Sequence, residues 1–281
     1  MRYVTFREGN AGLRPGVIEG DRIHPIDAPS LLDYIALPAS QRADRHTRED
    51  VALSSATLDA PIRPRRNAFC VGRNYLEHAK EGADALGIDL KLPSVPTFFT
   101  KATHAIAAPD TTLHLDAAAT SQYDWEVELA VVVAERCKNV AESDAMRVVF
   151  GYTIFNDVSA RDLQRAHGQW FKGKSLDDCA PIGPWIVSAD EIGDPHDLDI
   201  ALRVNGVEKQ HSNTGNMIFR IPRLIAELSK GMTLEPGDVI ATGTPEGVGF
   251  ARTPPEFLKD GDTMELEIAR IGVLRNRVSI K

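Results

Sequence analysis

The chain has 281 residues, of which 43% are hydrophobic and 26% charged, a composition ordinary for a soluble globular protein. A formal net charge of −8 without any densely basic stretch argues against nucleic acid as the main partner, because phosphate binding needs clustered Lys and Arg. The three cysteines form neither a CxxC pair nor a zinc pattern, and no apolar run reaches the roughly 18 residues that span a bilayer, so we expect a cytoplasmic protein with no membrane partner.

Residues 1–62 are predicted to form a small N-terminal α/β domain. Strand, hairpin and helix patterns follow one another there, at residues 3–6, 16–25 and 31–35, and the hairpin is expected to turn at Gly20-Asp21. The prolines and charges of Pro61-Ile-Arg-Pro-Arg-Arg66 then mark a linker. We therefore expect a second domain at residues 63–281.

The second predicted domain opens with a short apolar strand followed by a helix. Asn74 is placed to cap this helix, and Glu77 stands three residues later in a capping-box pattern. Gly87 is the expected end of the helix, and residues 87–97 are expected to form a loop.

The rest of the chain is rich in strand patterns and poor in helix patterns. Strands are predicted at residues 125–134, 148–156, 184–188, 198–204, 238–242 and 263–271, and helices at 159–167 and 218–229. Because strands and helices do not alternate regularly, the pattern argues against a doubly wound parallel sheet. We expect an α+β fold, either mixed or mostly β.

Two glutamates stand at the start of an apolar strand pattern, Trp125–Val133. Side chains alternate along a strand, so Glu126 and Glu128 share one face, about 7 Å apart. Both faces become apolar further along, which is typical of a strand buried on both sides, and two carboxylates there need a cation or protons. Glu265 and Glu267 repeat the Glu-x-Glu pattern in a cleanly alternating strand, where they are expected to face water.

A third carboxylate, Asp157, follows the apolar pattern Val148–Phe155 at the junction with a predicted helix. The capping-box pattern Ser159-Ala-Arg-Asp162 opens that helix, so one alternative is that Asp157 only caps it. Together with Glu126 and Glu128, however, it would supply three oxygen ligands and no soft ones. Such a set suits Mg²⁺ or Mn²⁺ and leaves positions for water and substrate.

A histidine and a glutamate are candidates for acid–base chemistry. His78 and Glu81 are three residues apart and therefore share a face of the predicted helix. A carboxylate beside an imidazole fixes its tautomer and raises its basicity. The other seven histidines are interpreted as structural.

Two glycine-containing segments carry weaker signals. Thr242-Gly-Thr-Pro-Glu-Gly-Val-Gly249 matches neither a Walker A motif nor GxGxxG, so nucleotide binding is not supported. Its backbone N–H groups and the Thr244 hydroxyl could meet an anion, although a tight turn is the simpler interpretation. Lys174, in Lys172-Gly-Lys174, could offer positive charge to a carboxylate or enolate, or be an ordinary exposed lysine.

Taken together, the pieces resemble the fumarylacetoacetate hydrolase family over about residues 67–281. The ordered motifs that carry the resemblance are Val71-Gly-Arg-Asn-Tyr-Leu-Glu-His78, Pro96-Thr-Phe-Phe-Thr-Lys101, Trp125-Glu-Val-Glu-Leu129, Phe155-Asn-Asp-Val-Ser-Ala-Arg-Asp-Leu-Gln164, Gly173-Lys-Ser175 and Thr242–Gly249. The resemblance implies a mixed β-roll catalytic domain behind a variable N-terminal domain, usually in a homodimer. It implies Mg²⁺ or Mn²⁺ held by Glu126, Glu128 and Asp157.

The resemblance also implies a reaction and further site residues. His78 and Glu81 match a water-activating pair on a mobile lid helix, and Lys174 a group that stabilises an enolate. The positions implied to contact or polarise the substrate are Arg73, Lys101, Gln164, Lys174 and Thr244. The pocket for the far side of the substrate is expected mostly within residues 82–97, with Trp170 and Phe171.

The reaction we expect is hydrolysis of a carbon–carbon bond in a 2,4-diketo acid of the acylpyruvate type. The same metal site could instead decarboxylate a β-keto acid such as oxaloacetate, or isomerise a dienedioate between keto and enol forms. A protein that only binds a keto acid is a third alternative. The intact His78–Glu81 pair favours hydrolysis, because decarboxylation needs no activated water.

Overall fold

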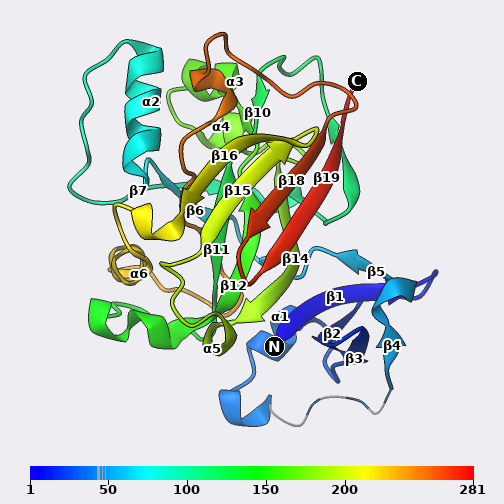
Figure 1. The fold of residues 1–281 in the computed structure, drawn as a ribbon. Helices are drawn as coiled ribbons and strands as arrows, with labels where there is room; N and C mark the ends of the chain where they lie inside the picture. The colour runs from blue at the N-terminus through cyan, green and yellow to red at the C-terminus, as the bar shows by residue number, and fades with distance from the viewer. Residues whose placement is uncertain (43–44, 46, 48) are drawn as a thin grey trace.

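The computed structural model describes residues 1–42, 45, 47 and 49–281. Within these ranges the larger of two main sheets has twelve strands: β1 (Arg2–Glu8), β2 (Arg14–Glu19), β3 (Arg22–Pro25), β4 (Val51–Ala52), β5 (Ala56–Asp59), β6 (Ala68–Gly72), β7 (Thr97–Lys101), β8 (Ile106–Ala107), β11 (Val127–Val133), β12 (Val149–Asn156), β14 (Ala180–Ser188) and β17 (Val239–Ala241). Its main path runs β4-β3-β2-β1-β14-β12-β11-β17-β6-β7 (Figure 1).

The second main sheet has the order β16-β15-β18-β19-β9. Its strands are β9 (Thr111–Leu115), β15 (Asp199–Val204), β16 (Val207–Asn213), β18 (Thr263–Ile268) and β19 (Gly272–Ile280), and a separate short pair joins β10 (Tyr123–Asp124) to β13 (Ser159–Ala160). The helices are α1 (Leu31–Ile35), α2 (Leu76–Leu86), α3 (Arg161–Ala166), α4 (Phe171–Lys174), α5 (Ala189–Ile192) and α6 (Ile221–Ser229).

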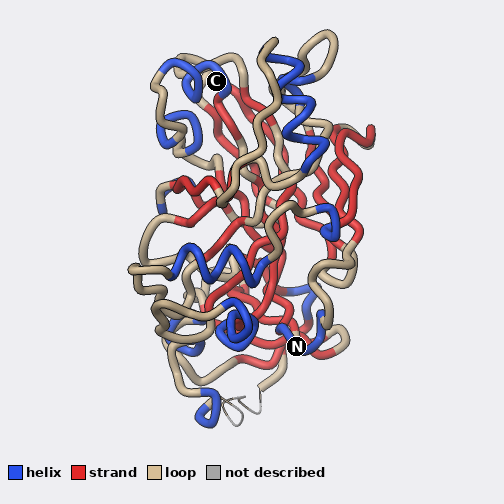
Figure 2. The backbone as a smooth tube through the Cα atoms, turned by 90° about the vertical axis from the view of Figure 1, so that its left-hand side faces the viewer, coloured by secondary structure: helices blue, strands red, loops and turns tan. Residues whose placement is uncertain are grey.

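Strands run through the middle of the molecule and the helices lie outside them (Figure 2). The predicted α+β class is therefore confirmed. In the part of the chain that the structure describes, no helix has the length and apolar character needed to cross a membrane.

Strand β11 is the centre of the fold, and each of its residues is buried. Val127, Leu129 and Val131 belong to one hydrophobic cluster, which includes side chains of the five-stranded sheet. Ala130 and Val132, on the opposite face, belong to a second cluster shared with the N-terminal unit. Burial on both sides, predicted from the sequence, is thus confirmed, and polar groups on this strand must find partners inside the protein.

The N-terminal strands extend the large sheet, because β1 pairs antiparallel with β14. The hairpin predicted at residues 16–25 is formed by β2 and β3, and the helix predicted at 31–35 is α1. Residues 61–66 lie outside helices and strands, as expected for a linker. Arg66 of this linker is ion-paired with Asp238, next to β17, so the two parts of the chain are also joined by side chains.

Both predicted capping boxes are wrong. The N-cap of α2 is Tyr75, without a side-chain cap bond, because the Asn74 amide is used elsewhere: it donates to the carbonyls of Phe219 and Thr242. Ser159 lies in β13, and its hydroxyl donates to the Asp157 carbonyl instead of capping α3. The predicted end of α2 is confirmed, since Gly87 adopts the left-handed conformation (φ 63°).

Candidate active site

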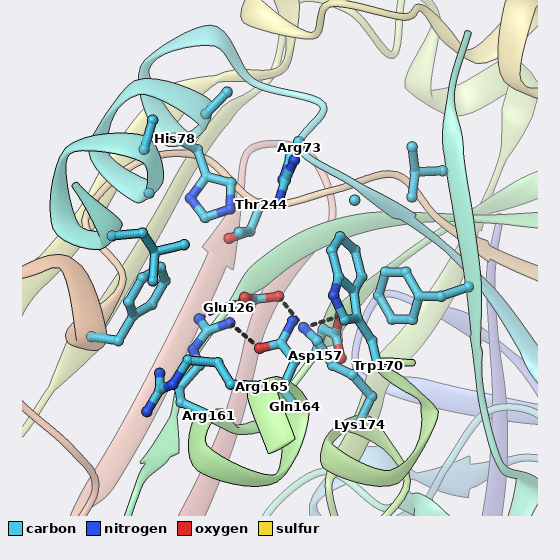
Figure 3. A pocket seen from close by; sticks show the side chains of 18 of the residues that line it. Arg73, His78, Glu126, Asp157, Arg161, Gln164, Arg165, Trp170, Lys174 and Thr244 are labelled. Atoms are coloured by element: carbon cyan, nitrogen blue, oxygen red, sulfur yellow. Dashed lines mark hydrogen bonds and ion pairs between the residues drawn. The ribbon is translucent and has the colours of Figure 1, made fainter. Parts of the chain in front are cut away.

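A cavity of about 430 Å³ opens beneath α2 and beside α3 and α4. Figure 3 shows the acidic residues and Lys174 at one end and His78, Arg73 and Thr244 at the other, with Trp170 along the side. Residues far apart in the sequence therefore meet here, as the sequence motifs predict. The cavity holds both the proposed metal ligands and the proposed base.

The three predicted metal ligands converge. Glu126, Glu128 and Asp157 are buried, and one ligand oxygen of each lies within 4.8 Å of the others. The convergence follows from strand register. Val127, the first residue of β11, pairs with Asn156, the last residue of β12, so Asp157 is the first residue after the paired strands. The Asp157 N–H donates to the Glu126 carbonyl at 2.9 Å, which fixes this end of the two strands.

Buried cations neutralise two of these carboxylates. The Lys174 ammonium lies 2.7 Å from both Glu126 Oε2 and Asp157 Oδ2, and Lys101 lies 2.7 Å from Asp157 Oδ1. Burial alone would raise the pKa of Glu126, but the charges of Lys174 and Arg161 outweigh it and hold the pKa below its usual range. Burial would lower the pKa of Lys174, but the two carboxylates raise it. The lysine is therefore held as a cation.

Glu128 has no such partner among the described residues. Its side chain accepts one hydrogen bond, from the Gly243 N–H at 2.8 Å. Burial raises its pKa well above the ordinary value, and the nearby charges of Asp157 and Glu126 raise it further. A buried carboxylate whose ionisation is opposed by two others fits the ligand set of a divalent cation, which would supply the missing charge. Three carboxylate donors suit a hard divalent cation.

His78 and Glu81 form the predicted pair on α2. His78 Nδ1 lies 2.8 Å from Glu81 Oε1, and the other Glu81 oxygen accepts from the Gly247 N–H at 2.8 Å. A carboxylate at Nδ1 favours the tautomer that carries its proton there, which leaves Nε2 as the acceptor. The ring lies in the cavity (Figure 3), so the pair offers an oriented base to a bound molecule.

The glycine-rich segment does bind anions, but they are the protein's own carboxylates. Gly243 and Gly247 have φ values of 100° and 99°, a region that favours glycine and turns the amides inward. The three amide–carboxylate pairs are Gly243 with Glu128, Gly247 with Glu81, and Gly249 with Asp124, at 2.7–2.8 Å. One loop therefore supports a proposed metal ligand (Glu128), the partner of the proposed base (Glu81) and the buried carboxylate of Asp124.

Asp124 and Arg161 belong to the site but were not predicted. Arg161 Nε donates to Asp124 at 2.8 Å, its Nη2 lies 2.6 Å from Glu126 Oε1, and its Nη1 donates to Gln164 at 3.1 Å. Asp124 precedes Glu126 by two residues, and this alternate spacing was the available signal. Arg161 was hidden inside the segment interpreted as a helix cap.

The predicted substrate-contacting residues divide into two groups. Arg73, Gln164 and Thr244 line the cavity, and the Thr244 hydroxyl accepts a hydrogen bond from Gln210. Lys101 does not line it: this fully buried side chain lies behind Asp157 and also donates to the Val158 carbonyl. Lys101 is the last residue of β7, and its ammonium is paired with Asp157, so it supports a proposed metal ligand and does not line the cavity.

The predicted pocket for the far part of the substrate is formed in part. Trp170 and seven of the ten residues from 82 to 91 line the cavity, whereas Phe171 does not and is 47% exposed. Apolar side chains dominate this outer part, contributed by Leu86, Ile88 and Leu90. The outer part of the cavity is therefore mainly apolar, whereas its floor is charged.

Gly173 sets how closely α4 packs on α3 and hence where Lys174 stands. A Cβ at this position would lie 2.4 Å from the Gln164 N and 2.7 Å from the Ala160 O. Because these are backbone atoms, Gly173→Ala is expected to lower the free energy of unfolding by about 1–3 kcal/mol. Denaturant titration measures the effect, with Gly12→Ala, where a Cβ meets nothing within 4 Å, as the control. Equal stabilities would contradict the packing constraint.

Known proteins match this chain over most of its length. The model of a family described as "Fumarylacetoacetate (FAA) hydrolase C-terminal" matches residues 67–279. The oxaloacetate tautomerase YisK of Bacillus subtilis (strain 168) is 46% identical over 81% of this chain and 74% of its own. The mitochondrial oxaloacetate tautomerase Fahd2a of Rattus norvegicus is 38% identical over 99% of this chain and 91% of its own. A solved structure titled fumarylacetoacetate hydrolase, from Exiguobacterium antarcticum, is 38% identical, covers 100% of both chains and has a TM-score of 0.84.

Proposed function

Because the chain belongs to the fumarylacetoacetate hydrolase family, we propose that it is a divalent-metal-dependent enzyme that interconverts the enol and keto forms of oxaloacetate-like 2-oxo acids. Relatives named oxaloacetate tautomerases, matched over almost the whole chain, support this choice over carbon–carbon hydrolysis. The observation that carries it is geometric: an oriented imidazole and a buried acidic triad share one cavity.

Tautomerisation requires only proton transfers. One proton leaves the enol hydroxyl and one is added at the adjacent carbon, with no water consumed and no other bond broken. His78, with Nδ1 held by Glu81, presents Nε2 to accept the first proton and to return a proton to carbon. The ammonium of Lys174 lies against the acidic floor, where it meets the negative charge of the enolate.

Glu126, Glu128 and Asp157 are the residues that would hold Mg²⁺ or Mn²⁺. A divalent ion bound there would anchor a 2-oxo acid and act as a Lewis acid that makes its enolate easier to form. The protein's own contribution is to keep these ligands buried and to place His78 opposite them across the cavity.

Hydrolysis of a 2,4-diketo acid is the second candidate. An imidazole that accepts a proton from an enol can equally accept one from water, so the His78–Glu81 pair does not separate the two reactions. The cavity of about 430 Å³ leaves room for an acyl group beyond a four-carbon acid, which favours keeping this candidate. Decarboxylation of oxaloacetate would break the bond to its distal carboxylate, release CO₂ and leave the enolate of pyruvate, which a proton converts to pyruvate.

We expect the Mn²⁺-loaded protein to accelerate ketonisation of freshly dissolved enol-oxaloacetate by about 100-fold or more, the range that a positioned acid–base group supplies. Loss of the enol's ultraviolet absorbance follows the reaction, and malate dehydrogenase reports the keto form as it appears. Protein treated with EDTA is expected to lose the acceleration and to regain it with Mn²⁺. Assays for pyruvate, and for cleavage of an acylpyruvate, run alongside. Faster acylpyruvate cleavage without ketonisation would establish the hydrolase instead.

A further inference from the structure

Arg73 stands at the end of the cavity opposite the acidic floor. Figure 3 shows it beside His78 and Thr244, with Trp170 between it and Lys174. Among the described residues, no carboxylate lies within ion-pair distance of its guanidinium. Its backbone has φ 57°, the left-handed region that a non-glycine residue occupies only at a cost. A charged, strained residue without a partner in a binding cavity suggests that its partner is a ligand.

The side chain of Arg73 is held in place by an aromatic wall. Its guanidinium lies over the Trp170 ring, 5.8 Å from the ring centroid. Trp170 packs edge-on against Phe99, with 5.2 Å between the ring centroids, and the Lys174 ammonium lies 5.2 Å from the centroid of the Phe99 ring. Trp170 and Phe99 thus form an aromatic wall between the Arg73 guanidinium and the Lys174 ammonium. The lack of a side chain at Gly72 leaves room for Trp170, because a Cβ at this position would lie 2.3 Å from the indole.

The other lysine and arginine side chains that line the cavity differ from Arg73 in their partners or in their packing. Arg161 and Lys174 are paired with buried carboxylates. Arg165 donates to Gln122, at 2.6 Å, which does not line the cavity. Lys91 and Arg73 are both exposed, but among the described residues no aromatic ring lies under the Lys91 ammonium, whereas the Arg73 guanidinium lies over Trp170. Among the described cations that line the cavity, Arg73 is therefore the one that lies over an aromatic ring and has no carboxylate or amide partner.

We propose that Arg73, held on Trp170, binds the carboxylate of the substrate that lies farthest from the acidic floor, and that it makes the site selective for dicarboxylic 2-oxo acids. The proposal rests on the proposed function and specifies its substrate class. The 2-oxo acid end lies at the floor, near Lys174. The flat enol lies along the indole, with its reacting carbon near His78. A guanidinium suits the far end, because its planar fork can take a carboxylate with two parallel hydrogen bonds.

The test compares two stable ligands that differ only at the far end. Malate and 2-hydroxybutyrate both have four carbons and a 2-hydroxy acid group, but 2-hydroxybutyrate ends in a methyl group. Calorimetric titration of the Mn²⁺-loaded wild-type protein is expected to show malate binding about 10- to 100-fold more tightly, as one charged hydrogen-bonded contact provides. In Arg73→Met this preference is expected to disappear, and Arg73→Lys is expected to restore only part of it.

Lys80→Met and Lys172→Met are the matched controls, since each removes a cation of α2 or α4 that does not line the cavity; both are expected to keep the preference for malate. With enol-oxaloacetate, Arg73→Met is expected to raise KM by the same factor and to leave kcat within a few fold, with unchanged thermal unfolding. An unaltered preference in Arg73→Met, loss of the preference in either control, or no binding of malate by the wild type would overturn the assignment. A wild type that binds malate through Arg73 but does not ketonise oxaloacetate would instead refute the proposed function and leave the subsite in place.

Discussion

Replacing Glu128 with glutamine is expected to abolish metal-dependent activity while leaving the metal-free protein at least as stable as the wild type. Glu128 is the one triad carboxylate that, among the described residues, has no ion-pair partner, and burial and its two acidic neighbours outweigh the Gly243 hydrogen bond, so its charge needs a divalent ion. Without the ion, the wild-type protein keeps a buried carboxylate beside two others, which is costly. The glutamine keeps the shape and removes the charge.

Two measurements test this expectation. Calorimetric titration with Mn²⁺ should show affinity lowered by more than about 100-fold, the upper end of what losing even a supporting group costs. Thermal unfolding should show that Mn²⁺ stabilises the wild type but not the variant. Glu265→Gln is the matched control from the second Glu-x-Glu pattern: this residue lies on β18, ion-paired with Arg275 at the surface, and should behave like the wild type. Equal effects of the two substitutions would rule out the metal site.

Replacing His78 with alanine should lower kcat for ketonisation by about 10²- to 10⁴-fold, the contribution of a positioned proton-transfer group. Metal affinity should not change, because the ring contacts Glu81 and not the triad. The chain offers a close control in His211, which lies 3.2 Å from Glu208 in the same i, i+3 spacing but is exposed. His211→Ala should leave kcat unaltered. A fall in kcat of less than tenfold in His78→Ala would assign the proton transfer to another group, with Lys174 the first to examine.

The sequence was most informative where a residue's neighbours along the chain decide its environment. Glu126 and Glu128 could be separated from Glu265 and Glu267 because apolar residues fill both faces of β11, whereas β18 alternates. Charge repulsion between two buried carboxylates then pointed to a metal ion before any family resemblance was used.

The sequence was least informative where distant backbone decides the outcome. Asn74 has the pattern of a helix cap, yet its amide joins the carbonyls of Phe219 and Thr242, residues that lie beside α2 only after folding. Strand β16 was missed because its exposed and half-buried polar residues give weak alternation. Lys101 has the appearance of a ligand-binding cation in the sequence, and only the register of β7 shows that it lies behind Asp157.

The loop that carries Gly243, Gly247 and Gly249 supports the site with main-chain amides, not side chains. Thr244, which lies between the first two of these glycines and lines the cavity, can therefore be varied without removing any of those three contacts. For redesign, this separates two properties that are usually coupled: the catalytic groups stay anchored while the wall of the chamber is rebuilt. A library restricted to Thr244 should yield enzymes with altered substrate range more often than libraries drawn from the acidic floor.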